Sequence, residues 1–270
     1  MEKTLTKEEK TGDMVMRNRI LKLILFSLSV FTVSVLLVSC DLSNQDLTYG
    51  YFRYRLENGN VTITRYTGPG GHITIPAQIN GNPVTTIGYY WSHGVIGAFE
   101  NRRLTSVSIP NSVTTIGLNA FARNQLTEIT IPDSVISLSG FFGNKLTSVT
   151  IPDSVKTIQR HAFARNQLTE VIISDSVTTI GWGAFSSNQL TSIIIPDSVT
   201  FIARLAFTEN PLTLITIGAD VNLHCANINL HDREAFGNRF DAFYYNNVRR
   251  AGIYSRPDVT STVWTFQEKK

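Results

Sequence analysis

The sequence predicts a repeat solenoid, in which one chain winds into stacked coils of short parallel strands. The main observation is a period: a Leu-Thr pair opens similar segments in steps of 22, 20, 22, 22 and 22 residues, at Leu104, Leu126, Leu146, Leu168, Leu190 and Leu212. A fixed period in this range is typical of stacked repeats that share one core. Hydrophobic residues make up 42% of the chain, which is ample for that core.

The columns of the repeat explain each part of a coil. Apolar residues such as Val149 and Ile151 alternate with polar ones, which predicts a short strand with one buried face. Pro152 and its equivalents then end the strand, because proline has no N–H to donate. Val155 and Ile158 return to the core. One phenylalanine per copy is expected to stack into a spine, namely Phe121, Phe142, Phe163, Phe185 and Phe207.

An asparagine near the end of each copy forms a second column. Its members are Asn101, Asn124, Asn144, Asn166, Asn188 and Asn210. An amide side chain both donates and accepts hydrogen bonds, so a stack of them can satisfy the backbone of successive turns. We therefore expect a structural role for this column, and no ligand bound to it.

Together the columns read L-x-x-I-x-I-P-x-x-V-x-x-I, followed by Ala-Phe and Asn, and they resemble the BspA-like leucine-rich repeats of treponemal type over about residues 61–245. The resemblance implies a leucine-rich repeat solenoid with a curved parallel β-sheet on the concave side and short helical turns or loops on the back. We expect repeats over residues 73–245, including an eighth strand from about Phe240 to Tyr245. The third copy departs from the pattern, because it is two residues short and has Phe141-Phe142 in place of Ala-Phe.

A β-hairpin is expected as a cap at each end. In residues 49–72, two alternating runs flank Asn58-Gly59, a pair that favours a tight hairpin turn. In residues 246–270, the runs Gly252–Ser255 and Thr262–Phe266 predict a closing hairpin. Such caps would cover the apolar edges that the first and last coils leave open.

The first 39 residues are typical of a lipoprotein signal peptide. Residues 20–38 are almost wholly apolar and follow two arginines. Leu37-Val38-Ser39-Cys40 resembles a bacterial lipobox, which implies that Cys40 carries lipid and that residues 40–48 form a tether to the membrane. The alternative is an uncleaved transmembrane helix. Because the first 13 residues are polar, we also hypothesise that translation starts at Met14 or Met16 instead of Met1.

Charge and cysteine content exclude some classes of function. The segment after Cys40 carries 18 basic and 17 acidic residues, so it has no excess of positive charge for nucleic acid. The two cysteines, Cys40 and Cys225, lie in very different contexts and predict no disulfide framework.

Catalytic and metal chemistry finds little support in the sequence. One cluster could hold zinc, and it consists of His224, Cys225, His231, Asp232 and Glu234. Its spacing fits no metal motif, and a lone buried thiol beside surface histidines is the preferred explanation, so no metal or other cofactor is expected. There is no nucleophile-elbow serine and no glycine-rich phosphate loop, so we expect no enzyme.

The outward positions of the strands are the candidate partner-binding residues. They are Glu128, Thr130, Ser148, Thr150, Glu170, Ile172, Ser192, Ile194, Leu214 and Thr216. This series becomes apolar at Ile172, which indicates a protein-binding surface, although β-branched residues also simply suit strands. A second candidate is Tyr89-Tyr90-Trp91, which would either anchor a partner or cover the first coil. Four flanking cations predict a solvated edge more than an anion site, namely Arg103, Arg123, Lys145 and Arg165.

The resemblance to BspA-like proteins also implies a function. It predicts a lipid-anchored protein of the bacterial cell envelope, in the outer membrane or at the cell surface, that adheres to host matrix proteins or bacterial surface proteins. The alternative is a periplasm-facing scaffold that binds an envelope protein or a glycan. The shared columns build the coil, so no binding residue can be carried over from the family.

Overall fold

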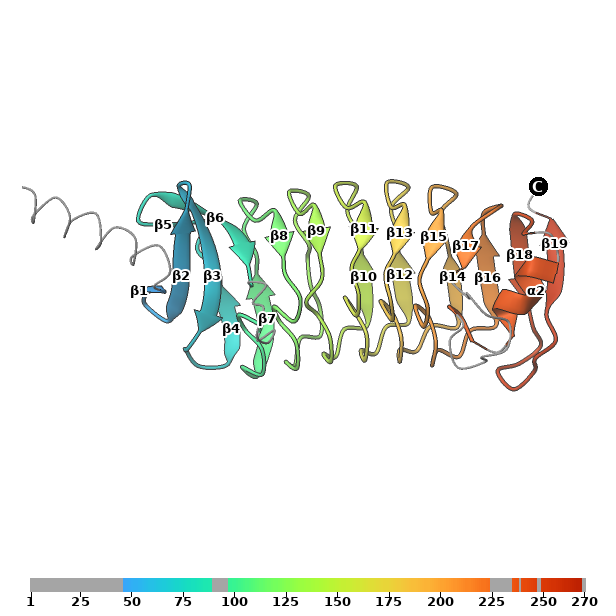
Figure 1. The fold of residues 1–270 in the computed structure, drawn as a ribbon. Helices are drawn as coiled ribbons and strands as arrows, with labels where there is room; N and C mark the ends of the chain where they lie inside the picture. The colour runs from blue at the N-terminus through green and yellow to red at the C-terminus, as the bar shows by residue number, and fades with distance from the viewer. Residues whose placement is uncertain (1–45, 89–96, 224–234, 238, 247–248, 269–270) are drawn as a thin grey trace, which may run out of the picture. The chain divides into compact units, whose positions relative to one another are not determined.

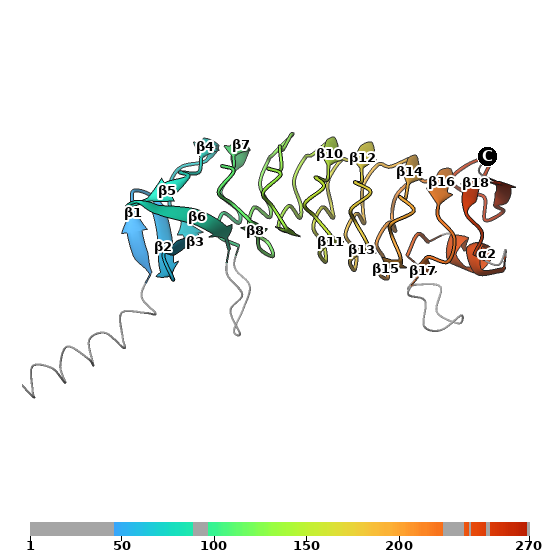
Figure 2. The same ribbon diagram turned by 90° about the horizontal axis from the view of Figure 1, so that it is seen from above.

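The computed structural model describes residues 46–88, 97–223, 235–237, 239–246 and 249–268. Within these residues the chain winds through successive coils that stack side by side (Figure 1). Most repeats contribute one strand to each of two columns, and the columns lie on opposite sides of the coils (Figure 2). The predicted repeat solenoid is therefore confirmed.

One column forms an uninterrupted sheet, called here the long sheet. Its strands, in order, are β1 (Leu47–Tyr49), β2 (Phe52–Glu57), β3 (Asn60–Tyr66), β6 (Asn82–Ile87), β8 (Thr115–Ile116), β9 (Ser137–Leu138), β11 (Thr157–Ile158), β13 (Thr179–Ile180), β15 (Phe201–Ile202) and β17 (Asn222–Leu223), with β5 (Gln78–Ile79) paired to β6. From β3 onward all neighbours along this order are parallel. The sequence placed residues such as Ile158 in the core but did not predict this ladder, because two-residue strands are too short to show alternation.

The strands that were predicted after each leucine form the other column, but not as one sheet. They make three short sheets: β4 (Gly71–Thr74) with β7 (Leu104–Ser108); β10 (Ser148–Thr150) with β12 (Glu170–Ile172); and β14 (Ser192–Ile194), β16 (Leu214–Ile217), β18 (Gly252–Ser255) and β19 (Thr265–Glu268). The strand expected at residues 128–130 does not form. The outward side of β4, β7, residues 127–131, β10, β12, β14 and β16 is called the front face below.

A stack of phenylalanine rings runs through the core. Neighbouring rings from Phe99 to Phe236 lie 4.8 to 5.6 Å apart, with interplanar angles of 4 to 17°. The predicted spine is confirmed except in the short third copy. There Phe141 is fully buried and occupies the stack, whereas Phe142 is only half-buried beside it. The prediction of Phe142 as the spine residue was wrong, because the two-residue deletion places the spine position earlier in this copy, at Phe141.

The asparagine column bonds backbone groups of adjacent coils. In Asn166, Oδ1 accepts from the Leu146 N–H at 3.2 Å, while Nδ2 donates to the carbonyls of Phe141 and Phe163 at 3.0 and 2.9 Å. Asn124, Asn144, Asn188 and Asn210 repeat this pattern. Asn101 does not belong to the column, since it is exposed and follows its phenylalanine by two residues instead of three.

The N-terminal hairpin is confirmed. β2 and β3 pair antiparallel around Asn58-Gly59, and both turn residues have positive φ, 51° and 77°. β3 then pairs in parallel with β6, so the hairpin extends the long sheet over the first coil. The folded part also takes in Asp46, Leu47 and Thr48, which the sequence assigned to the tether. The Asp46 carboxylate lies 2.9 Å from Nε of Arg55 and accepts a hydrogen bond from Thr64.

The strand predicted from Phe240 to Tyr245 is wrong, because these residues form the helix α2 (Phe240–Asn246). Phe240 and Tyr244, four residues apart, share one helical face and pack on Tyr254 at 5.4 and 5.7 Å. The Tyr244 hydroxyl donates to the carbonyl of Gly218 at 2.7 Å. β18 instead takes the place beside β16, where it runs antiparallel. The closing hairpin of β18 and β19 is confirmed, with its second strand starting at Thr265.

Several predictions concern residues outside the described ranges. They are the signal peptide with Cys40, the Tyr89-Tyr90-Trp91 insertion, and the cluster from His224 to Glu234. In the ranges that the structure does describe, no helical segment has the length and hydrophobicity needed to span a membrane.

Candidate protein-binding face

The structure places the ten candidate residues along the front face. Nine of them are exposed and Thr216 is half-buried. The sheets hold several of them side by side: Thr150 is paired with Ile172, and Ile194 with Thr216. Glu128 and Thr130 lie on the same face but outside any strand. The predicted alternation therefore holds for the side chains even where the ladder is absent.

The ladder of the front face is interrupted in two places, at the third copy and between β12 and β14. Three equivalent amides donate to the next coil, those of Ile75, Ile151 and Ile195, which lie 3.0, 2.8 and 2.8 Å from the carbonyl oxygens of Ser108, Ile172 and Thr216. The amides of Ile109, Ile131 and Ile173 occupy the same position but make no such bond within the described residues. Residues 127–131 consequently run between β7 and β10 without pairing to either strand.

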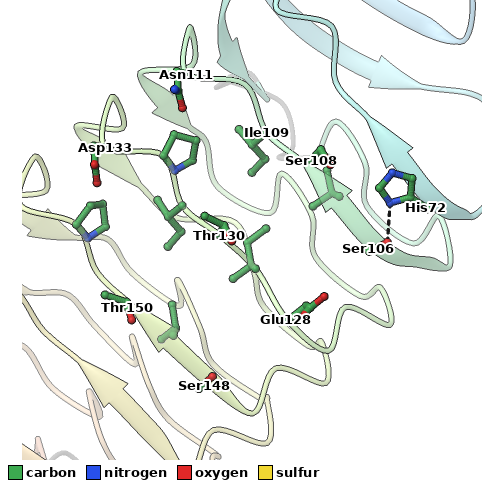
Figure 3. Close-up of a pocket in the computed structure, with 16 residues that line it drawn as sticks. His72, Ser106, Ser108, Ile109, Asn111, Glu128, Thr130, Asp133, Ser148 and Thr150 are labelled. Atoms are coloured by element: carbon green, nitrogen blue, oxygen red, sulfur yellow. Dashed lines mark hydrogen bonds between the residues drawn. The ribbon is translucent and has the colours of Figure 1, made fainter.

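A groove of about 920 Å³ lies over this interruption. Its floor includes Ile129 and Ile131, and its polar lining comes from three successive coils and from β4: His72, Ser106, Ser108, Asn111, Glu128, Thr130, Asp133, Ser148 and Thr150 (Figure 3). His72 Nδ1 lies 2.7 Å from the hydroxyl of Ser106 at one end of the groove. The groove thus brings together four of the predicted residues, Glu128, Thr130, Ser148 and Thr150.

The other end of the front face is apolar. The side chains of Ile172, Ile194 and Leu214 are 53%, 67% and 41% exposed. Ile172 and Ile194 hold the same position in neighbouring repeats, on β12 and β14. Thr216 is paired with Ile253 of β18, so the outward column continues onto the C-terminal hairpin. Apolar side chains with this exposure, next to a polar groove, are typical of a protein-binding surface.

Two of the four flanking cations, Arg123 and Arg165, contact neighbouring side chains. Arg123 lies 3.4 Å from the Glu100 carboxylate, and the Arg165 guanidinium lies 5.7 Å from the centre of the Phe142 ring. Lys145 and Arg103 are exposed on the same flank. These contacts fit the predicted solvated edge.

His161 has a structural environment away from the front face. Its ring lies 4.4 Å from Trp182 and 6.0 Å from Phe142, measured between ring centres. Burial lowers its pKa below the ordinary value, and the positive charges of Arg160 and Arg165 lower it further. Burial thus favours the uncharged form of a ring that packs within an aromatic cluster. Within the described residues, no three side chains of histidine, cysteine, aspartate or glutamate are grouped to hold a metal ion.

The sequence missed part of the groove. His72 and Asp133 were not predicted as binding residues, although each follows from the repeat: His72 lies on the first-copy strand, and Asp133 follows Pro132 in the turn. No pattern in the sequence of residues 127–131 predicts the interruption of the ladder there. It coincides with the one copy that is two residues short.

Comparison with known proteins identifies the same type of repeat in this chain. A family model described as "BspA type Leucine rich repeat region" matches residues 96–222 in six copies. Similar solved structures include a leucine rich cell surface protein from Faecalibacterium prausnitzii A2-165 (30% identity, 69% of this chain and 57% of that one, TM-score 0.47) and the pneumococcal vaccine antigen PcpA (18% identity, 66% and 51%, TM-score 0.51). A leucine rich repeat protein from T. pallidum is 27% identical over 57% of this chain and 63% of its own, with a TM-score of 0.35.

These comparisons define the class of protein. Residues 96–222 match the BspA-type leucine-rich repeat model, so this part of the chain consists of repeats of that type. The likeness to PcpA supports the fold alone. This chain spans only 57% and 51% of the first two similar structures. No curated protein matches the chain.

Proposed function

We propose that this chain is a protein-binding module of the bacterial cell envelope, and that its front face contacts the partner. The exposure of Ile172 and Ile194 carries the proposal, because it leaves two large aliphatic side chains in water on neighbouring repeats. β propensity explains a branched residue on a strand, but a threonine satisfies it too, as at the equivalent position Thr150. The repeat supports a binding role because a solenoid presents one long continuous surface.

The proposed setting is the cell surface, where the protein mediates adhesion to host matrix proteins or to other bacteria. The lipobox at Cys40 supports a lipid anchor, and the similar protein of F. prausnitzii is a leucine rich cell surface protein. The alternative, a periplasm-facing scaffold, is distinguished by treating intact cells with protease. Cleavage of the protein on intact cells supports adhesion, whereas protection until the envelope is broken counts against it.

Replacing Ile172 and Ile194 together with aspartate is expected to abolish partner binding by cells that carry the full chain. Charged groups at these positions would have to be desolvated in the complex. Both side chains are exposed in the free protein, so the thermal midpoint should shift by less than roughly 4 °C. Adhesion is measured to surfaces coated with extracellular-matrix proteins and to cells of a second bacterium.

Ile136→Asp is the matched control. Ile136 is 61% exposed but follows Val135, outside the front face, so this variant should adhere like the wild type. Adhesion that survives in the Ile172/Ile194 variant would exclude the apolar part of the front face as the contact. A wild-type protein that adheres to neither probe would count against adhesion itself.

A further inference from the structure

The sequence Asn-Gly-Asn occurs twice in the chain, each time in a tight hairpin turn. Asn58-Gly59 joins β2 to β3, and Asn80-Gly81 joins β5 to β6. The two asparagines have φ values of 51° and 50°, and the two glycines have values of 77° and 81°. All four residues are exposed. The backbones of the two turns are therefore closely similar, and a difference in their chemistry must come from the side chains.

An Asn-Gly pair can lose ammonia without an enzyme. The backbone nitrogen of the glycine attacks Cγ of the asparagine, and the new N–Cγ bond closes a succinimide ring. The Cγ–Nδ2 bond breaks, and the departing nitrogen takes the proton of the glycine amide and leaves as ammonia. Water then opens the ring at either carbonyl, which gives aspartate or isoaspartate. Glycine favours this closure because it has no Cβ to hinder the attacking nitrogen.

The attacking nitrogen is available in both turns. Among the residues that the structure describes, no hydrogen bond is donated by the amide of Gly59 or of Gly81. A Cβ added to either glycine would meet no atom within 4 Å, so the space around both is open. Access to the glycine therefore does not distinguish the two turns.

The asparagine side chains do distinguish them. Asn80 Nδ2 donates a hydrogen bond of 3.1 Å to the hydroxyl of Tyr54, which is buried, and the preceding residue Ile79 is buried too. The side chain of Asn58 makes no hydrogen bond in the part of the chain that the structure describes, and the preceding residue Glu57 is exposed. Asn80 must consequently break a bond before its Cγ can turn toward the glycine nitrogen, whereas Asn58 need not.

We propose that Asn58 is a site of spontaneous deamidation by water, and that the bond to Tyr54 protects Asn80 from the same reaction. The consequence falls on the N-terminal hairpin. Isoaspartate carries the chain through its side-chain carbon, so it adds one carbon atom to the backbone of a two-residue turn. The pairing of Glu57 with Asn60, which closes this turn, then loses its register. Modification at Asn58 thus loosens the hairpin that covers the first coil.

Mass spectrometry of the digested full chain tests the proposal after incubation at mildly alkaline pH, which helps to deprotonate the attacking nitrogen. Aspartate and isoaspartate should form at Asn58 at least about threefold faster than at Asn80, as expected from the loss of one hydrogen bond. No conversion at Asn58, or conversion at Asn80 that is as fast, would overturn the proposal. The rates are measured without a partner, so either result leaves the proposed role of the front face untouched.

Two controls separate the effect of structure from that of sequence. In urea both turns unfold, and the two asparagines should then convert at similar rates because each is followed by Gly-Asn. Tyr54→Phe removes the hydroxyl and keeps the ring in the core, so conversion at Asn80 should rise by about threefold while that at Asn58 stays unchanged. A difference that persists in urea, or an equal rise at both sites in the variant, would contradict protection by Tyr54.

The effect on the hairpin is tested with the aged protein. Asn58→Asp supplies the aspartate product with an unaltered backbone, and Asp-Gly is also favoured in such turns. The chromatographic fraction that carries isoaspartate at position 58 should unfold at a lower urea concentration than this variant. Equal unfolding midpoints would show that the hairpin tolerates the added carbon atom and would refute the loosened hairpin.

Discussion

Replacing Asn166 with alanine is expected to lower the free energy of unfolding by about 2–4 kcal/mol. The substitution removes the acceptor of the Leu146 N–H, which is buried and has no other partner within reach in this turn. It also removes one of the two amides that donate to each of the carbonyls of Phe141 and Phe163. Those carbonyls keep their bonds from Asn144 and Asn188. The orphaned N–H therefore dominates the loss, and each carbonyl adds a smaller part.

Urea-induced unfolding followed by circular dichroism measures this loss. Gln167→Ala is the control at the next position, where the side chain is exposed, and it should change the unfolding free energy by less than about 0.5 kcal/mol. A loss below about 1 kcal/mol for Asn166→Ala would contradict the structural role of the column.

Phe141→Ala is expected to destabilise the protein by about 3–5 kcal/mol, whereas Phe142→Ala should cost only about 1 kcal/mol. The Phe141 ring is fully buried between Phe121 and Phe163, at 5.4 and 5.5 Å, so its removal leaves a cavity in the spine. The Phe142 ring is half-buried and contributes an edge contact to His161 and a cation–π contact to Arg165.

The same urea titration compares the two alanine variants directly. Phe141→Leu serves as a third variant that keeps most of the volume and should lose less than Phe141→Ala. Equal losses for the two alanine variants, or a larger loss at Phe142, would place the wrong ring in the spine.

The repeat itself could be predicted from the sequence because each coil must satisfy the same physical demands. Val149, Ile151 and Val155 fill a shared core, and Pro152 ends the strand at the same point of every coil. The hairpin at Asn58-Gly59 was predictable for a similar reason, since both residues tolerate positive φ. In these places the local chemistry allows one structure.

The errors arose where the pattern allowed two alignments. A deletion in the third copy made Phe141 and Phe142 equally good candidates for the spine. The spacing decides between them, since Asn124 and Asn166 bond to the phenylalanine carbonyl three residues earlier, and Asn144 does so only with Phe141. The same spacing excludes Asn101 from the column.

The C-terminal helix shows a different limit. Phe240, Phe243 and Tyr245 match the spacing of a repeat strand, but Phe240 and Tyr244 also match one face of a helix. Packing of α2 against Tyr254 and the bond from Tyr244 to Gly218 decide the outcome, and both are contacts between distant parts of the chain. Residue patterns of one segment cannot show such contacts.

The candidate site was predicted in part. Alternation along the strands located all ten outward residues on one face, because a strand of period two fixes which side chains point outward. It did not show that the ladder is interrupted at Thr127–Ile131, since hydrogen bonding between coils depends on their spacing. The groove, with His72 and Asp133 in its lining, follows from that interruption.

Hydrogen exchange of the backbone amides tests the account of the front face most directly, namely that its ladder is open at the third copy. In the free full chain, the Ile131 amide should exchange at least about tenfold faster than the equivalent Ile151 amide, which donates to the Ile172 carbonyl at 2.8 Å. An Ile131 amide that is as protected as Ile151 would contradict the claim.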